Sequence, residues 1–318
     1  MPCDRFAVVR PSNVRHALYL MSGRSMKYES AFAYIIYGNS LEHFEEAVLS
    51  IGTLRRFGTA RPILVLTDRP DQFPRIHGLH TVPLDRPTLD GWIGKSGYHF
   101  RVKLEGLCLL LSCYTKKVIF LDTDTLVRRD IDCWFSRIND STALLHNFEG
   151  PLSTGKFCGH FQNVLNRTFS NDAFGQFTIR PTSPMYNSGV IGVAQAHLHC
   201  LDAALWLMDE INPRITSHNA EQMALGYMLS RDGRVRTVGD RTVYHYWYRD
   251  RGRYVKQQLS DLLQRYSAES IMSDPRLAHQ VRQQRNFRLW KQDKLRRLRR
   301  KGVIEPLKKW HMRQSWRL

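Results

Sequence analysis

The sequence predicts an α/β protein built on an open sheet, and two observations carry this prediction. Residues 32–37, 62–68 and 118–121 are apolar segments of strand length, and residues 41–57 place apolar side chains at helical spacing. Short strand-helix-strand connections of this kind favour parallel strands with ligands at their carboxyl ends. The N-terminal half of the chain is therefore predicted to be Rossmann-like.

The remaining elements of the N-terminal half follow from turn residues and helical spacing. Gly58 stands where a glycine commonly follows a helix end. Residues 81–84 predict a short strand and residues 98–114 a helix, whereas residues 1–30 have no clear period and predict a loosely ordered extension. No GxGxxG follows the first strand and no GxxxxGK[ST] occurs, so neither a dinucleotide fingerprint nor a P-loop is predicted.

The second half of the chain alternates less regularly. Residues 142–146 predict a strand, and residues 150–184 predict a long polar loop because few apolar positions are periodic. Residues 185–193 join an Asn-Ser-Gly lead-in to Val-Ile-Gly-Val, which predicts a turn feeding a buried strand. The other predicted elements are a helical turn at 131–135, helices at 201–211 and 219–230, a strand at 242–247, and only helix beyond residue 254.

The buried strand at residues 118–121 ends in two carboxylates, Asp122 and Asp124. Residues i and i+2 of an extended segment point to the same side, so both carboxylates can converge at the carboxyl edge of the sheet. Like charges held this close repel each other unless a cation lies between them, and a hard divalent metal ion prefers oxygen ligands. A metal site is therefore favoured over the acid and base pair of a glycosidase, whose carboxyl groups lie farther apart.

The formal charge of +18 is concentrated near the C-terminus, where residues 276–318 hold 15 Lys and Arg against two acids. Leucine and tryptophan at helical spacing between these bases predict basic amphipathic helices, which suit an anionic membrane surface. Packing against the body of the protein or a second subunit explains the same pattern equally well. Nucleic-acid binding is disfavoured because the tryptophans fit an apolar helix face better than a base-stacking surface.

Composition predicts a globular protein, with 42% hydrophobic residues and no apolar run approaching the roughly 18 to 20 residues of a membrane span. The N-terminus lacks the residue order of a signal peptide, so the expected compartment is the cytosol, with peripheral contact at the inner face of the membrane. Reduced, mostly structural thiols are predicted because no CxxC pair occurs among the six cysteines, Cys3, Cys108, Cys113, Cys133, Cys158 and Cys200.

Three signatures occur in order along the chain: Leu121-Asp122-Thr123-Asp124, Asn187-Ser188-Gly189-Val190, and His245 in a late strand. Together they resemble the retaining nucleotide-sugar glycosyltransferases of the glycogenin-like group, glycosyltransferase family 8, which have the GT-A fold. The resemblance covers roughly residues 32–254. It implies a catalytic domain at 31–255 with a GT-A type open mixed sheet, between an N-terminal extension at 1–30 and a basic helical C-terminal extension at 256–318.

The resemblance implies that Asp122 and Asp124 bind Mn²⁺ or Mg²⁺, which bridges the diphosphate of a UDP-sugar, and that His245 completes the metal site. A histidine in an aromatic strand is, taken alone, more often a core residue than a ligand. The implied activity is transfer of a hexose from a UDP-sugar to a glycan or a lipid-linked acceptor, with retention of anomeric configuration. A GT-A-like protein that binds without turnover is the alternative.

The chain departs from the family pattern in two places. The family places a glycine and then Lys-Pro-Trp after the histidine, where this chain has Arg249, Arg251 and Arg253. An arginine suits a diphosphate, although all three could also coat a solvated face. The family's Asp-Gln pair near the sugar appears as Glu221-Gln222, and the longer carboxylate argues against a nucleophile; Glu221 also suits the first turn of a helix.

The sugar is expected to lie over Asn187, Ser188 and Gly189. Asn187 and Gln222 would then form hydrogen bonds with its hydroxyl groups or interact with the oxocarbenium-like centre. With Glu221, these residues are the catalytic candidates, and retention follows from the resemblance rather than from their spacing.

The uridine and ribose are expected beside Tyr37, Asn39 and Asp68, which lie at the carboxyl ends of the first two predicted strands. In the helix before Asp122, the family commonly has a basic residue that pairs with phosphate or aspartate. Arg101 and Lys103 both match this position, and Lys103 is preferred. Either one could equally be an ordinary surface base.

Overall fold

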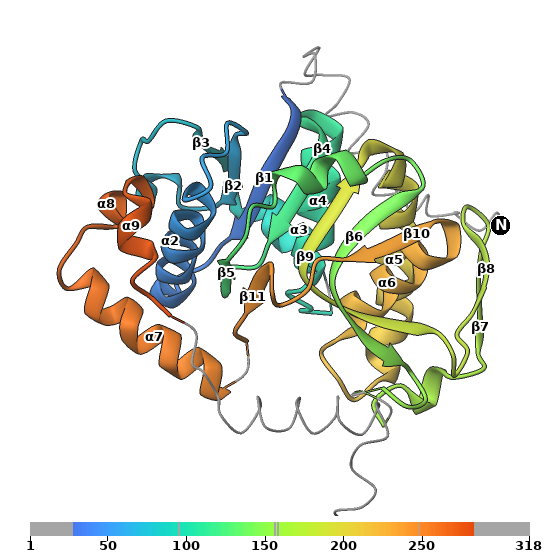
Figure 1. Ribbon diagram of the computed structural model, residues 1–318. Helices are drawn as coiled ribbons and strands as arrows, with labels where there is room; N and C mark the ends of the chain where they lie inside the picture. The colour runs from blue at the N-terminus through green and yellow to red at the C-terminus, as the bar shows by residue number, and fades with distance from the viewer. Residues whose placement is uncertain (1–27, 95, 156, 158, 248, 283–318) are drawn as a thin grey trace, which may run out of the picture.

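The computed structural model describes residues 28–282 except 95, 156, 158 and 248, and describes the backbone but not the side chains of 249–251. Within this part of the chain, the centre is a seven-stranded open sheet in the order β10-β6-β9-β4-β1-β2-β3 (Figure 1). Its strands are β1 (Tyr28–Ile36), β2 (Ile63–Thr67), β3 (Leu79–Pro83), β4 (Thr115–Leu121), β6 (Thr142–Pro151), β9 (Pro184–Ala194) and β10 (Arg234–Thr237).

The strand directions make the sheet mixed. β1 pairs in parallel with β2 and β4, β2 pairs in parallel with β3, and β10 pairs in parallel with β6. β9 runs antiparallel to both of its neighbours, β4 and β6. The open mixed sheet and the Rossmann-like N-terminal half predicted from the sequence are therefore confirmed.

Helices cover both faces of the sheet (Figure 1). One face carries α3 (Arg86–Ile93), α4 (Arg101–Cys113), α5 (Leu198–Ile211) and α6 (Ala220–Asp232). The other face carries α2 (Leu41–Arg55), α7 (Arg249–Leu263), α8 (Ala268–Ser273) and α9 (Pro275–Ala278). Short 3-10 turns lie at Pro70–Gln72, Asp132–Arg137, Gln162–Val164, Gln195–His197 and Asn212–Arg214.

The strands divide their side chains between two cores because successive residues point to opposite faces of a sheet. Along β4, Val118 and Phe120 pack under α4 and α5, whereas Ile119 and Leu121 pack against α2. β1 behaves in the same way. The central strands are thus buried on both faces, as their unbroken apolar sequences predict.

The region predicted to be a long polar loop, residues 150–184, contains regular structure, so that prediction is wrong. It holds the end of β6 and a hairpin of β7 (Thr168–Asn171) with β8 (Gly175–Thr178). Phe169 and Phe177 pair across this hairpin and are buried, with Ile179, in the core beneath the sheet. The buried apolar residues of this region are too unevenly spaced to produce a visible period in the sequence.

The late strand, one helix and one further strand also differ from prediction. The late strand shortens to β11 (Val243–His245), which pairs with β5 (Thr125–Val127) outside the main sheet. Helix α3 and strand β10 lie where no element was predicted, because polar residues fill most of their exposed faces. The predicted extension at 1–30 and the tail at 283–318 lie outside the described residues, apart from the start of β1.

In its described part, which ends at residue 282, the C-terminal segment is helical as predicted. Helix α7 runs through the predicted domain boundary at residue 255, and its Val255 and Leu259 enter the core with Ile271 of α8. In the described part of the chain, no helix combines the length and apolar character needed to cross a bilayer.

Contact between α2 and the C-terminal helices depends on Gly52. A Cβ added there would lie 2.6 Å from the carbonyl oxygen of Ile271 and 2.7 Å from the Cβ of Ala278. We expect Gly52→Ala to lower the free energy of unfolding by about 1–3 kcal/mol, the usual cost of overpacking, as measured by urea denaturation.

The matched control is Gly91→Ala in α3, where an added Cβ meets nothing within 4 Å. That substitution should raise stability by about 0.5–1 kcal/mol, because alanine is the better helix former. Equal stability of the two variants would contradict the close packing of α8 and α9 on α2.

Candidate active site

The antiparallel direction of β9 places its first residues beside the carboxyl end of β4. Leu121 pairs with Val190, and the backbone N–H of Asp122 donates to the carbonyl oxygen of Gly189 at 2.9 Å. The turn Asn187-Ser188-Gly189, remote in sequence, is thereby brought against Asp122. All of these residues lie at the edge where the parallel strands end.

Pairing of β5 with β11 brings His245 to the same edge. His245 lies opposite Thr125, and the N–H of Tyr246 donates to the carbonyl oxygen of Asp124 at 3.0 Å. The Nε2 atom of His245 then lies 3.0 Å from Oδ1 of Asp124 and 3.8 Å from Oδ2 of Asp122. The three side chains proposed from the sequence as metal ligands are thus adjacent, with their ligand atoms within 4.8 Å of one another.

Gly189 leaves the space that the His245 imidazole occupies. A Cβ on Gly189 would lie 2.3 Å from Nδ1 of His245 and 2.5 Å from its Cε1. Any other residue at position 189 would therefore displace the imidazole or the strand. The glycine of the Asn-Ser-Gly turn has a packing reason that its sequence position alone did not reveal.

Asn187 orients the imidazole. Its Oδ1 accepts from the N–H of Gly189 at 3.0 Å and lies 2.9 Å from Nδ1 of His245. Because the backbone N–H fixes Oδ1 as the acceptor, Nδ1 of His245 must donate to it, which directs Nε2 toward the carboxylates. A hydrogen bond on the second ring nitrogen is the usual support of a metal-binding histidine.

The acidic groups are balanced by neighbouring positive charge. Burial alone would raise the pKa of Asp124, but the charge and hydrogen bond of His245, with Lys103, hold it below its ordinary value. Burial would lower the pKa of His245, but Asp124 and Asp122 raise it above its ordinary value. The cluster therefore favours bound positive charge.

Lys103 extends from α4 into the cluster. Its Nζ lies 2.9 Å from Oδ1 of Asp122 and donates to Oγ of Ser188 at 3.3 Å. Burial lowers the pKa of Lys103, but Asp122 and Glu221 raise it more, so the side chain stays charged. Arg101, the other basic candidate in this helix, instead pairs with Asp209 at 3.1 Å.

Glu221 and Gln222 contact the turn from the start of α6. Ser188 Oγ donates to Oε2 of Glu221 at 3.0 Å, and the N–H of Ser188 donates to Oε1 of Gln222 at 3.4 Å. Burial raises the pKa of Glu221. Among the described residues, the buried Nε2 of Gln222 and Oε1 of Glu221 have no hydrogen-bond partner, and both residues line the cavity.

One cavity of about 1350 Å³ is lined by the three metal-ligand candidates and by Lys103, Ser188, Glu221 and Gln222. Also in its lining, Tyr37 stacks on His99 with ring centroids 6.1 Å apart, and Asp68 accepts from the N–H of Gly38 at 3.1 Å. Asn39 lines the same wall and accepts from Arg69. The cavity thus reaches from the carboxylates to the ends of β1 and β2.

Of the three arginines after His245, Arg253 is exposed and lines the cavity, whereas the side chains of Arg249 and Arg251 lie outside the described structure. The sequence reasoning missed Lys256, one turn further along α7, which also lines the cavity and lies 3.2 Å from the buried Glu46. Lys256 was not predicted because residues 256–318 were assigned to a C-terminal extension. Its helical spacing from Arg253 could have indicated its place in the site.

His146 is another residue that sequence reasoning missed. Its Nδ1 lies 3.1 Å from Oδ1 of Asn187, and its ring meets that of His245 edge-on at 5.4 Å. Burial and the charge of His245 lower the pKa of His146. Nothing in the sequence around this strand marks the histidine, because its partners come from β9 and β11.

The donor set fits a divalent metal ion. Two carboxylates and one imidazole converge, the imidazole is oriented by Asn187, and the paired acids already attract the cation of Lys103. Oxygen-rich sites of this kind suit Mg²⁺ and Mn²⁺, and an imidazole is compatible with Mn²⁺. Asp122, Asp124 and His245 are therefore the residues that could hold the ion.

No family model and no curated protein sequence matches the chain. Among solved structures, the apo bifunctional glycosyltransferase WbbM matches with 10% identity over 66% of this chain and 38% of its own, at a TM-score of 0.41. The galactosyltransferase LgtC in complex with donor and acceptor sugar analogs matches with 13% identity over 79% of this chain and 96% of its own, at a TM-score of 0.45. A Gln-to-Glu active-site mutant of LgtC matches with 12% identity over 66% and 73% of the two chains, at a TM-score of 0.43. The chain thus spans 38% of the length of WbbM.

Proposed function

We propose that the protein is a metal-dependent glycosyltransferase that moves a hexose from a UDP-sugar to a glycan or glycolipid acceptor with retention of configuration. The observation that carries the proposal is the convergence of Asp122, Asp124 and His245 at the carboxyl edge of the sheet. This cluster opens into a cavity of about 1350 Å³. Such a volume exceeds the roughly 300–1,000 Å³ of ordinary ligand pockets and leaves room for a donor and an acceptor together.

Departure of the nucleoside diphosphate requires positive charge where the glycosidic bond breaks. A bound Mn²⁺ or Mg²⁺ would supply that positive charge, as a Lewis acid, against the negative charge of the leaving diphosphate. Lys103 lies against Asp122 and supplies a fixed cation at the same place. Arg253 and Lys256 line the cavity from α7 and supply the charge that the family's lysine would give.

The sugar would lie over the turn at Ser188, as the sequence predicts. The Nε2 group of Gln222 is buried without a partner in the described structure, so it is the donor best placed to bind a sugar hydroxyl or ring oxygen. Oδ1 of Asn187 is already used by Gly189 and His245, which makes Asn187 a positioning residue for the metal ligand. Glu221 is buried and holds Ser188, which suits orientation of the turn better than nucleophilic attack.

The uridine would occupy the wall formed by Tyr37, His99 and Asp68. The stacked Tyr37–His99 pair offers an aromatic surface for the base, and a carboxylate of Asp68 can accept from ribose hydroxyls while it holds Gly38. The uridine and the metal ion would then occupy one continuous cavity, as the binding of one nucleotide sugar requires.

Asp122→Asn and Asp124→Asn test the proposal directly. Each substitution keeps the size of the side chain and removes the charge that holds the metal ion. Mn²⁺-dependent hydrolysis of the preferred UDP-sugar is expected to fall by on the order of 100- to 1,000-fold, as with loss of one charge-stabilising group. A screen of UDP-sugars by released UDP identifies the donor and measures the rates.

Asp71→Asn, at an exposed 3-10 turn, is the matched control and should keep the wild-type rate. Wild-type hydrolysis by both site variants would refute the metal-dependent mechanism. Binding of UDP-sugars by the wild-type protein without hydrolysis or transfer to any acceptor would instead support the non-catalytic alternative.

Gly189→Ala tests the imidazole separately from the carboxylates. Because the added Cβ would lie 2.3 Å from Nδ1 of His245, the ring must move away from Asp124. We expect the Mn²⁺ concentration for half-maximal activity to rise by about 10- to 100-fold, the usual effect of disturbing the support of a metal ligand. Calorimetric titration with Mn²⁺ should show the same loss, and an unchanged affinity would remove His245 from the metal site.

We also propose that the basic tail holds the enzyme at anionic membranes, close to a lipid-linked acceptor. Residues 283–318 hold 13 Lys and Arg and two acids. Polybasic segments gain about 1 kcal/mol per Lys or Arg near an anionic surface. Helix α9 before this tail packs on α2, so we expect a chain ending at residue 282 to keep the described fold.

Truncation after residue 282 should abolish sedimentation with phosphatidylserine vesicles while leaving hydrolysis of the donor unchanged. Neutral vesicles are the control, because only the anionic surface attracts the tail. Undiminished binding of the truncated chain to anionic vesicles would contradict the proposal. If truncation abolished binding to duplex DNA at physiological salt but left vesicle binding unchanged, the tail would be assigned to nucleic-acid binding instead.

A further inference from the structure

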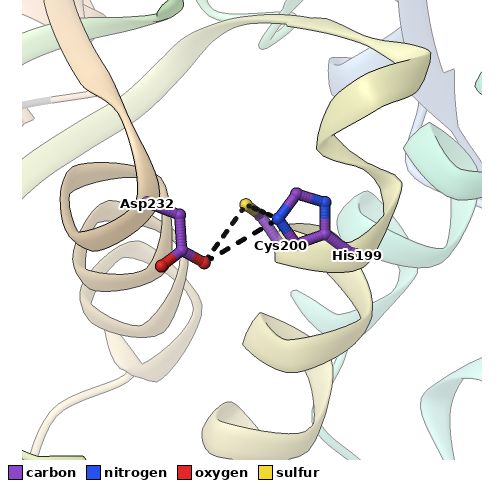
Figure 2. A group of neighbouring side chains, drawn as sticks. All are labelled: His199, Cys200 and Asp232. Carbon is purple, nitrogen blue, oxygen red and sulfur yellow. Dashed lines mark hydrogen bonds and ion pairs between the residues drawn. The ribbon is translucent and has the colours of Figure 1, made fainter. Parts of the chain in front are cut away.

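Within the described residues, a second cluster of metal-ligand side chains lies apart from the cavity, between α5 and α6. Figure 2 shows His199 and Cys200 from the first turn of α5 and Asp232 from the last turn of α6, pointing toward one another. None of these three residues lines the cavity described above. The cluster therefore needs an explanation separate from glycosyl transfer.

The distances within the cluster match a single tetrahedral ion. Sγ of Cys200 lies 3.2 Å from Nε2 of His199 and 3.8 Å from Oδ2 of Asp232, and the latter two atoms are also 3.8 Å apart. With zinc bonds of about 2.3 Å to sulfur and about 2.0–2.2 Å to nitrogen and oxygen, tetrahedral ligands lie roughly 3.4–3.6 Å from one another. Shifts of a few tenths of an ångström would complete the geometry.

The atoms not facing the cluster are held by other groups. Nδ1 of His199 lies 2.8 Å from the carbonyl oxygen of Ala196 and must donate to it, which leaves the lone pair of Nε2 directed at Cys200. Oδ1 of Asp232 pairs with Nε of Arg231 at 3.2 Å, which leaves Oδ2 for the cluster. A histidine and a carboxylate each fixed by an outer partner are the arrangement expected around a bound metal.

A nucleophilic role suits Cys200 poorly. The residue is 2% exposed, and burial, with the charge of Asp232, raises the pKa of its thiol to about 12. A catalytic thiolate needs partial exposure and positive surroundings. His199 is by contrast 65% exposed at its side chain, so a cation can reach the cluster from solvent.

We propose that His199, Cys200 and Asp232 bind Zn²⁺, with water as the fourth ligand. The thiol proton of Cys200 leaves to solvent as the zinc–sulfur bond forms, so the thiolate replaces the S–H that now points to Asp232. A mixed sulfur, nitrogen and oxygen donor set selects zinc over Mg²⁺ or Ca²⁺. The ion would tie the beginning of α5 to the end of α6, and α6 carries Glu221 and Gln222 at its opposite end.

Titration of the full-length reduced protein with Co²⁺ tests the site, because a cobalt–thiolate bond gives a charge-transfer absorption that oxygen and nitrogen ligands do not. We expect one equivalent of Co²⁺ to produce this band and Zn²⁺ to displace it. The band should disappear in Cys200→Ser, and the affinity should fall at least about tenfold in His199→Ala, consistent with loss of one ligand.

Controls separate this site from the other metal cluster and from other thiols. The Asp122→Asn/Asp124→Asn double variant, the exposed Cys133→Ser and the exposed His77→Ala should all keep the band. In the Asp122→Asn/Asp124→Asn background, where the other metal cluster is disabled, Zn²⁺ should also raise the melting temperature, and it should raise it less when His199→Ala is added, since binding to the native state stabilises it.

Two outcomes would overturn the proposal. One is the absence of a thiolate band in the wild-type protein with excess Co²⁺. The other is an unchanged Co²⁺ affinity in His199→Ala, whose exposed side chain can be removed without disturbing the core. Should Cys200→Ser fail to fold, as judged by circular dichroism, the histidine variant decides the question.

Discussion

The antiparallel pairing of β9 with β4 is the contact on which the candidate site depends. Strands that run in parallel bring only their carboxyl ends to the site edge, whereas β9 brings its amino end and with it the turn at Asn187-Ser188-Gly189. The hydrogen bond from Asp122 to Gly189 fixes the register of this pairing. A slip by one residue would turn every side chain of β9 to the other face, removing Asn187 from His245 and burying the wrong residues against Leu144.

Charge balance explains how so many ionisable groups share a buried edge. Asp122 and Asp124 lie together because Lys103 and His245 approach them from α4 and β11, so each carboxylate has a nearby cation. Buried acids without such partners would be protonated instead. Glu221 differs from Asp124 because burial raises its pKa by more than the charge of Lys103 lowers it. Burial and neighbouring charge together therefore set the pKa of these two acids in opposite directions.

Local pattern predicted the main strands and the two carboxylates, whereas the place of His245 beside them was expected only from the family resemblance. Unbroken apolar runs predicted β1, β2 and β4, and Asp122 and Asp124 were visible because two carboxylates, spaced one residue apart, end the last of these runs. The hairpin around Phe169 was missed because its few apolar residues are fixed by the core beneath them. His146 and Lys256 were missed for a related reason: each reaches the site only through the pairing of distant strands or the docking of α7. Tertiary contacts of this kind leave little trace in the local sequence: none at His146, and only the helical spacing from Arg253 at Lys256.

The two metal-ligand clusters differ in a way that would sort ions between them. Affinity for a given nitrogen or oxygen site rises from Mn²⁺ toward zinc, so Asp122, Asp124 and His245 would not reject zinc by strength of binding. Cys200 changes the comparison, because a thiolate favours zinc far more than Mn²⁺ or Mg²⁺. A chain with both clusters would bind scarce zinc first between α5 and α6, leaving the carboxylate cluster for the harder ion that a diphosphate requires. On this argument the thiol protects the selectivity of a site with which it makes no contact.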